Sequence, residues 1–244
     1  MAQKEILYRN RPLSIAYEMV RPKASKTLLF LHGWGSNKEI MKQAFGNVFQ
    51  NYRLLFVDMP GFGKSPNETE ILTTEDYAKI LKSLLEALSM TPVAIFGHSF
   101  GGKVATLMHP PLLVLLSSAG IVMPKPFSIR MKIALYKRLK SLGGERLRSL
   151  FASSDVNGMP QNMYETFKNV VDEDFSGVFG RYEGRALLFW GDSDSATPPE
   201  AGRKIASLIK KSSLFELEGD HYFFLHHTKE IENQTLKALI DGTS

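Results

Sequence analysis

Six short apolar segments constrain the fold of this chain more than any other feature of its sequence. Within each segment the apolar residues run almost without interruption, which is typical of strands that are buried on both faces of a sheet. The segments span residues 27–34, 52–61, 92–99, 112–120, 185–194 and 212–221. Turn residues and helical patterns separate them, and this alternation predicts an α/β fold with a mostly parallel sheet flanked by helices.

Two further segments have patterns that predict their local structure. The first 20 residues are interpreted as a β-hairpin. Residues 73–88 show a helical pattern that opens with Thr73, whose side chain can cap the helix, and Glu75 follows near its start.

Residues 121–180 interrupt the alternation, because they are rich in Met, Phe, Lys and Arg, have a helical pattern and contain no clear strand. We interpret them as a helical cap that is inserted between two strands of the sheet. The core then consists of residues 1–120 and 181–244.

The composition excludes several classes of protein. The 244 residues include no cysteine, which excludes a disulfide framework and a thiolate nucleophile and fits a reducing cytoplasm. The amino-terminal residues lack the apolar core of a signal peptide. The longest apolar run, residues 112–123, is too short and too interrupted by Ser and Gly to span a membrane. We therefore expect a cytoplasmic protein without stable membrane insertion.

Chemically active residues follow most of the predicted strands. The carboxyl ends of parallel strands meet at one edge of a sheet, where ligands bind in folds of this class. The residues that reach this edge are 32–34, Asp58, Ser99, Asp192 with Asp194, and His221. We expect them to converge on one site.

Residues 97–101 read GHSFG, a G-x-S-x-G motif between a predicted strand and a predicted helix. Its glycines permit a sharp turn that lifts the serine hydroxyl out of the sheet. Ser99 is therefore a candidate nucleophile, and a tight structural turn with an idle serine is the alternative. The helix after Ser99 must be short, because the next strand begins near Leu112.

A serine hydroxyl is a poor nucleophile at neutral pH and needs a neighbouring base. His221, just after the last predicted strand, is the candidate. His32 and His98 lie inside glycine turns that serve the backbone, and His109 precedes two prolines.

The last two histidines, His226 and His227, are expected on the final helix in a solvated or packing role. Together with His221 they match no usual spacing of metal ligands, so we expect no metal site. Acyl transfer by a serine nucleophile and a histidine base requires no organic cofactor.

The base needs a carboxylate to orient it, and the segment WGDSDSATP offers Asp192 and Asp194. The order serine, aspartate, histidine along the chain is the one expected in this architecture. Residues 115–120, after the preceding strand, contain no carboxylate. We favour Asp194, with Asp192 holding the loop through local hydrogen bonds.

Acyl transfer also needs hydrogen-bond donors for the negative oxygen of the intermediate. The backbone N–H of Phe100 follows the candidate nucleophile directly, and the N–H of Trp34 is the expected second donor. The indole of Trp34 is also interpreted as an aromatic wall of the pocket.

The segments HGWGS, VDMPGFGKS, GHSFGG, WGDSDSATP and GDH, in this order and spacing, resemble the α/β-hydrolase superfamily. The resemblance covers nearly the whole chain, with residues 121–180 in the place of the variable helical cap of that superfamily. It implies a serine hydrolase and excludes branches that have Asp at the nucleophile position. The residues it implies are Ser99 as nucleophile, Asp194 as acid, His221 as base, and Trp34 and Phe100 as oxyanion donors.

The segments HGWGSN and FVDMPGFGKS are similar to esterases that cleave the methyl ester of pimeloyl-acyl-carrier protein in biotin synthesis. This resemblance implies a carboxylic ester as substrate, either small or bound to an acyl carrier protein. Cap residues Phe127, Met131, Leu135 and Phe167 are then expected to hold the acyl chain.

Two other functions remain open. Residues 117–121 and 163–175 resemble hydrolases that cleave a carbon–carbon bond in 2-hydroxy-6-oxo-dienoates, although those enzymes usually have Asn where this chain has His98. A hydrolase fold used only for binding is disfavoured, because Ser, Asp and His are all present.

The basic charge of the chain is concentrated in residues 125–148, which carry eight Lys or Arg and one Glu, whereas the whole chain has a net charge of +5. One interpretation is a docking surface for an acidic carrier protein, because complementary charge speeds encounter. The expected docking residues are Arg130, Lys132, Lys137, Arg138 and Lys140. The other interpretation is a solvated cap surface. The segment lacks the basic–aromatic pattern of nucleic-acid binding, so no nucleic acid is expected.

Overall fold

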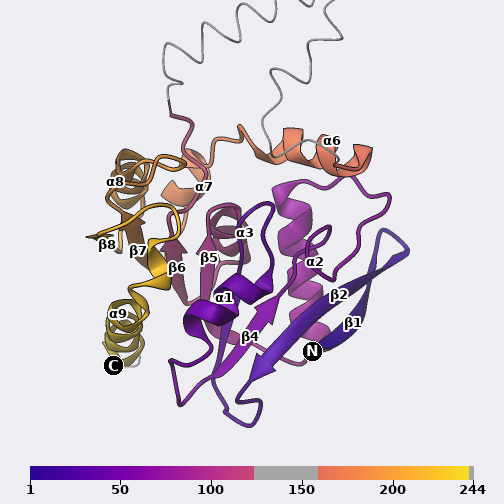
Figure 1. Ribbon diagram of the computed structural model, residues 1–244, viewed down its shortest axis with the longest axis horizontal. Coiled ribbons are helices and arrows are strands. Elements are labelled where there is room, and N and C mark those ends of the chain that lie inside the picture. The colour runs from indigo at the N-terminus through magenta and orange to yellow at the C-terminus, as the bar shows by residue number, and fades with distance from the viewer. Residues whose placement is uncertain (124–158, 242–244) are drawn as a thin grey trace, which may run out of the picture.

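The computed structural model of the protein describes residues 1–123 and 159–241, and its centre is an eight-stranded sheet (Figure 1). The strand order is β1-β2-β4-β3-β5-β6-β7-β8. The strands are β1 (Ala2–Tyr8), β2 (Arg11–Val20), β3 (Thr27–Leu31), β4 (Arg53–Val57), β5 (Pro92–His98), β6 (Leu112–Leu116), β7 (Arg185–Gly191) and β8 (Ser212–Leu217). β2 pairs antiparallel with β1 and β4, and β3 to β8 are all parallel. The predicted hairpin and all six predicted strands are confirmed.

The helices alternate with the parallel strands, as predicted. They are α1 (Lys38–Phe45), α2 (Thr74–Ala87), α3 (Phe100–Met108), α6 (Gln161–Val170), α7 (Ser176–Gly180), α8 (Pro199–Leu208), the 3-10 helix η3 (Phe223–Leu225) and α9 (Thr228–Asp241). In the part of 121–180 that the structure describes, α6 and α7 occur and no strand does. None of the helices in the described ranges is long and apolar enough to cross a membrane.

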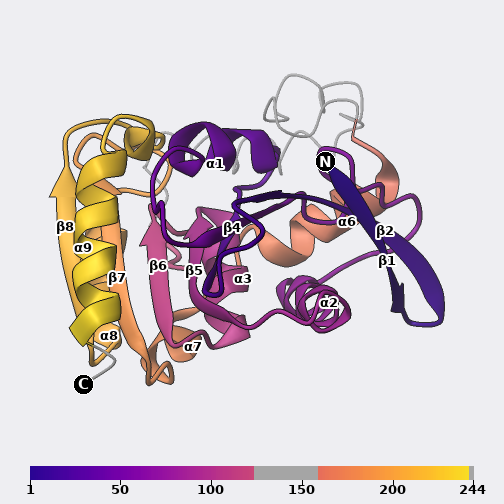
Figure 2. The ribbon, with the colours of Figure 1, turned by 90° about the horizontal axis from the view of Figure 1, so that it is seen from below.

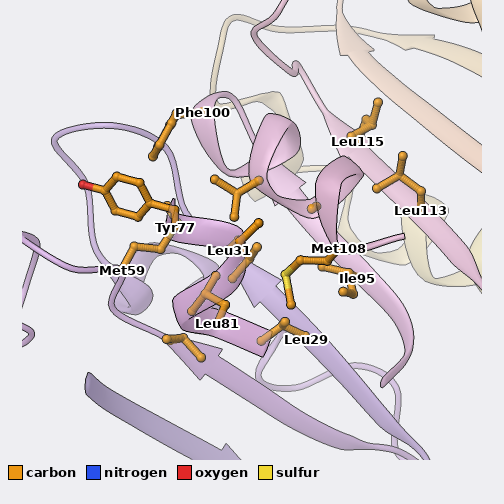
Figure 3. Close-up of a cluster of buried hydrophobic side chains, with 14 of the residues drawn as sticks. Leu29, Leu31, Met59, Tyr77, Leu81, Ile95, Phe100, Met108, Leu113 and Leu115 are labelled. Atoms are coloured by element: carbon orange, nitrogen blue, oxygen red, sulfur yellow. The ribbon is translucent and has the colours of Figure 1, made fainter. Parts of the chain in front are cut away.

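Both faces of the sheet are buried, because successive side chains of each strand point to opposite faces. Leu29 and Leu31 pack in one apolar cluster with α2, α3 and α8, and part of this cluster is shown in Figure 3. Leu28 and Phe30 pack in a second cluster with α1 and α9. α1 and α2 accordingly lie on opposite sides of the sheet (Figure 2). This explains why the strand segments are apolar throughout rather than alternating.

The start of α2 confirms that Thr73 caps the helix, and Asp76 is the residue that pairs with it. The Thr73 side chain accepts a hydrogen bond from the N–H of Asp76, and the Asp76 carboxylate accepts one from the N–H of Thr73. Asp76, rather than Glu75, therefore completes the capping box. The same carboxylate accepts a hydrogen bond from the hydroxyl of Tyr8, which ties the hairpin to α2.

Helix α6 lies across the end of the sheet at which the parallel strands finish (Figure 1). The hydroxyl of Thr166 accepts a hydrogen bond of 3.0 Å from the N–H of Leu72. At the other end of the helix, the ammonium group of Lys103 on α3 donates to the carbonyl of Val170 over 2.6 Å. These two contacts fix α6 against the loop before α2 and against α3, at the carboxyl edge of the sheet.

Candidate active site

Ser99 lies in the turn between β5 and α3 with φ 50° and ψ −115°. A positive φ is uncommon and strained for a residue that has a side chain, and such residues cluster at functional sites. Three hydrogen bonds hold this backbone: the N–H of Ser99 donates to Leu116, and its carbonyl accepts from Gly102 and Ala119, at 3.0–3.1 Å. The ends of β5 and β6 therefore fix the turn that presents the serine.

The glycines on both sides of Ser99 allow this turn to pack. A methyl group on Gly97 would lie 2.4 Å from the carbonyl oxygen of Gly101, and one on Gly101 would lie 2.6 Å from the carbonyl oxygen of His32. Neither position accepts a side chain without backbone movement. α3 is short, with nine residues, as expected from the spacing, and ends at His109 in the left-handed conformation.

Asp194 and His221, which follow β7 and β8, lie in direct contact. The Nδ1 of His221 is 2.7 Å from the Oδ2 of Asp194. The other carboxylate oxygen accepts the backbone N–H groups of Ala196 and Thr197 at 2.8 and 2.9 Å. The Asp194 side chain is fully buried, and 18% of the His221 side chain is exposed. The carboxylate is therefore held in place and shielded from solvent, whereas part of the imidazole is exposed to solvent.

The hydrogen bonds at Asp194 keep it ionised. Burial alone would raise the pKa of this carboxyl, but the bonds from His221 and the N–H of Thr197 outweigh burial and lower the pKa to about 2. A carboxylate opposite Nδ1 fixes the proton of the imidazole on that nitrogen and leaves Nε2 free as an acceptor.

Asp192, the alternative acid, contacts loop residues rather than His221. It is exposed and accepts hydrogen bonds from the N–H of Gly219 at 3.1 Å and the hydroxyl of Ser193 at 2.9 Å. The bond from Gly219 joins the loop after β7 to the loop after β8. The structure thus gives the histidine contact to Asp194 and a loop contact to Asp192.

The two buried histidines at this edge have both a fixed tautomer and a low pKa. The Nε2 of His32 accepts from the N–H of Met59 at 3.0 Å, and its Nδ1–H donates to Gly33 at 2.7 Å. The Nε2–H of His98 donates to the carbonyl of His221 at 3.0 Å. Burial lowers the pKa of His32 to about 4 and that of His98 to about 3. Neither is suited to accept a proton near neutral pH.

The placement predicted for the last two histidines is wrong, because α9 begins only at Thr228. His226 is exposed, and the Nε2–H of His227 donates to the carbonyl of Glu218 at 2.8 Å. Within residues 1–123 and 159–241, no group of three or more acidic or histidine side chains is arranged to hold a metal ion.

The loop after β3 packs directly on the serine turn. A methyl group on Gly33 would lie 3.2 Å from the Cβ of Ser99, so the backbone of Trp34 begins next to the nucleophile candidate. In the described residues, the backbone N–H groups of Trp34 and Phe100 have no hydrogen-bond acceptor. Two free donors beside one hydroxyl are the arrangement that an oxyanion requires.

An aromatic wall stands on the Trp34 side of the site. The centroid of the Trp34 ring lies 4.8 Å from that of Phe62, 5.5 Å from that of Phe100 and 5.3 Å from that of Phe167 on α6. Phe167 is the one expected pocket residue within the described ranges. The other three, Phe127, Met131 and Leu135, lie outside them, as do the five expected docking residues, Arg130, Lys132, Lys137, Arg138 and Lys140.

A cavity of about 210 Å³ lies on the other side of the serine turn, between the end of β6, the end of α6 and the start of α8. Its wall includes Ala119, whose N–H donates to the carbonyl of Ser99, and Thr197, which donates to Asp194. Its lining mixes small and apolar side chains, among them Ala119, Ile121 and Ala201, with the carboxylates of Asp172 and Glu173. The cavity therefore offers both apolar and polar surface next to the serine turn.

Residues 28–234 match the alpha/beta hydrolase family. The chain belongs to this family. Over 100% of both chains, the fold is similar to a thermophilic esterase from Thermogutta terrifontis, with a TM-score of 0.76 and 15% identity. At that identity, the likeness concerns the fold of this alpha/beta hydrolase and not its substrate.

Two curated relatives cover most of the chain. A pimeloyl-[acyl-carrier protein] methyl ester esterase from Chromobacterium violaceum is 24% identical over 83% of this chain and 90% of its own length. A 2-hydroxy-6-oxononadienedioate/2-hydroxy-6-oxononatrienedioate hydrolase from Klebsiella pneumoniae is 25% identical over 78% of both chains. This alpha/beta hydrolase is thus similar to enzymes of both kinds that its sequence resembles.

Thr197 is a part of this alpha/beta hydrolase site that was not predicted from the sequence. Its N–H and its hydroxyl both donate to Asp194, and its hydroxyl oxygen is 3.3 Å from the Nδ1 of His221. A local sequence pattern could have indicated the bond from the N–H of Thr197. An aspartate in a turn commonly accepts hydrogen bonds from backbone groups two or three residues further along the chain.

Proposed function

We propose that this alpha/beta hydrolase is a serine hydrolase that cleaves carboxylic esters through an acyl-enzyme. Ser99 is the nucleophile, His221 the general base and Asp194 the acid that orients the base. One observation carries the proposal: the 2.7 Å bond between His221 and Asp194, with the His221 ring 4.6 Å from that of His98, the residue before a serine held at positive φ. A buried carboxylate, an imidazole and a strained serine at one sheet edge are the parts that such catalysis needs.

The reaction begins when the Oγ of Ser99 attacks the ester carbonyl carbon while the Nε2 of His221 takes the hydroxyl proton. The backbone N–H groups of Trp34 and Phe100 stabilise the negative oxygen of the tetrahedral intermediate. Its collapse breaks the bond to the alcohol, which leaves with the proton from His221. Water then attacks the acyl-enzyme with His221 again as base, and the acid is released. Asp194 stabilises the imidazolium in both steps.

The methyl ester of a pimeloyl chain on an acyl carrier protein is the substrate that we propose. The Chromobacterium violaceum relative supports it by its name, and residues 32–37 and 56–65 are the segments that carry the resemblance to such esterases. The positive charge of residues 125–148 fits an acidic carrier. The aromatic wall of Trp34, Phe62 and Phe167 suits an uncharged acyl chain.

Hydrolysis of a carbon–carbon bond in a 2-hydroxy-6-oxo-dienoate is the second candidate. The Klebsiella pneumoniae relative favours it. It ranks second because those enzymes usually have Asn at the position that His98 occupies here. A binding protein without catalysis is the least favoured, because Ser99 is present and the acid–base contact between Asp194 and His221 is intact.

The test compares three substrates: pimeloyl-acyl-carrier-protein methyl ester, a p-nitrophenyl ester and a 2-hydroxy-6-oxo-dienoate. Each is assayed at low and high salt with the wild type and Ser99→Ala. We expect the carrier-bound ester to be cleaved fastest, with an advantage that salt removes. Equal rates for both esters without a salt effect would contradict the carrier-bound substrate and leave a general esterase activity. Cleavage of the dienoate alone would favour the second candidate.

A further inference from the structure

The imidazole of His98 is buried between two loops that the proposed mechanism uses. On one side its Nε2–H donates to the backbone carbonyl of His221 over 3.0 Å. Its ring also packs against three rings of that loop, with centroids 4.6 Å from His221, 5.2 Å from Tyr222 and 4.8 Å from Phe224. The side chain that precedes the nucleophile therefore holds the backbone of the base.

On its other side, the same ring contacts the loop of the oxyanion donors. A methyl group on Gly33 would lie 3.0 Å from the Nδ1 of His98. This nitrogen is buried and has no hydrogen-bond partner in the part of the chain that the structure describes. His98 is joined to Ser99 by one peptide bond. Its ring therefore sets the positions of the base loop and the oxyanion loop relative to the nucleophile.

The contact to a carbonyl fixes the protonation of this ring. Nε2 must carry the hydrogen, and the buried Nδ1 has no acceptor in the described residues for a second one, so the neutral ring with a lone pair on Nδ1 fits the site. The ionisable groups near it are His221, Asp194 and His32. Burial is the main reason that the pKa of His98 is as low as about 3, so the ring stays a neutral donor throughout the neutral range.

We propose that His98 is a positioning residue that fixes His221 at its backbone while Asp194 fixes it at its ring. This inference rests on the proposed function, since it assigns His221 as the base. Asp194 alone leaves the imidazole free to pivot about the carboxylate. A shift of about 1 Å in a reacting group can cost about 100-fold in rate, so a second constraint on His221 has a large effect on turnover.

Three variants separate the hydrogen bond from the space that the ring fills. His98→Phe keeps an aromatic ring and removes the donor. His98→Gln keeps a neutral N–H donor at a similar reach, and His98→Asn has the same amide on a shorter side chain. His109→Asn is the control, because His109 is an exposed histidine at the far end of α3.

Three quantities are measured for each variant: kcat and KM for a p-nitrophenyl ester, the rate of labelling by a fluorophosphonate, and the unfolding temperature. We expect His98→Phe and His98→Asn to lose about 10- to 100-fold in kcat and in labelling, with KM changed less than about 3-fold. His98→Gln should recover most of the rate, and His109→Asn should equal the wild type.

The inference is overturned if folded His98→Phe labels and turns over like the wild type, or if His98→Gln is as slow as His98→Phe. If the Phe variant does not fold, equal rates of the Gln and Asn variants overturn it. A change in KM alone also contradicts it. Normal activity in the wild type with no difference among the variants refutes this inference only. Absence of labelling in the wild type refutes the proposed function, and this inference with it.

Discussion

Asp58 and Asp194 both follow parallel strands at the carboxyl edge of the sheet, and both side chains are fully buried. Their partners differ. Asp58 contacts the ammonium group of Lys38 at 3.0 Å and accepts the N–H groups of Lys38 and Lys64. Only 2% of the Lys38 side chain is exposed. Asp194 instead contacts His221, which is partly exposed.

The difference lies in which partner can exchange a proton. Burial alone would lower the pKa of Lys38, but its bonds to Glu39 and Asp58 raise it, so the ammonium group keeps its charge. The imidazole of His221, in our proposal, takes up a proton and returns it during the reaction. The same buried carboxylate therefore stabilises the fold beside Lys38 and, in our proposal, supports chemistry beside His221.

The largest effect is expected for Asp194→Asn, which removes the charge that orients His221. We expect kcat for a p-nitrophenyl ester to fall by about 10³- to 10⁴-fold, because the amide no longer fixes the tautomer. Asp192→Asn is the matched control, since Asp192 contacts only the loops, and its kcat should change less than about 3-fold. Equal losses in the two variants would contradict the assignment of the acid.

Lys38→Met tests the other aspartate. It leaves Asp58 buried without its cation, so we expect a loss of about 3–5 kcal/mol in the free energy of unfolding, measured by denaturant titration. Lys42→Met on the same helix removes an ion pair to Glu18 whose partners are partly exposed, and it should cost less than about 1 kcal/mol. The folded fraction of Lys38→Met should retain wild-type kcat. Loss of kcat in that fraction would show that the two aspartates do not differ as proposed.

The pH dependence of stability gives a smaller effect. The pKa of Asp194 is about 2 in the folded protein and 3.8 for an unperturbed carboxyl. A lowered pKa contributes stability above the unfolded value, and this is lost as the pH falls from about 4 through about 2. The contribution is roughly 2 kcal/mol. Unfolding measured between these pH values should show a shallower loss for Asp194→Asn than for the wild type, and identical slopes would contradict the low pKa.

The contrast between the aspartates also shows where the sequence is informative. The six strands and Ser99 could be predicted because continuous apolar runs and a glycine turn are local patterns. The loop of the acid could be predicted because it follows a strand in the expected chain order, but Asp192 and Asp194 share that loop, and only the contact with His221 separates them. Nothing in the local pattern of residues 38–45 separates Lys38, which is buried, from Lys42, which is partly exposed. The bond from His98 to His221 joins residues 123 positions apart, so only the folded chain reveals it.

Lys103 is a second buried cation, and its substitution has the smallest expected effect. Its ammonium group contacts the carboxylate of Glu173 at 2.8 Å and the carbonyl of Val170 at 2.6 Å, and it is 1% exposed. Its acidic partner, however, is 32% exposed, in contrast to Asp58. In Lys103→Met, Glu173 can regain water, so the loss in the free energy of unfolding should be only about 1–2 kcal/mol, mostly from the unpaired carbonyl of Val170. Denaturant titration beside Lys38→Met tests this order. A loss as large as that of Lys38→Met would mean that burial of the cation, rather than of its carboxylate partner, sets the cost.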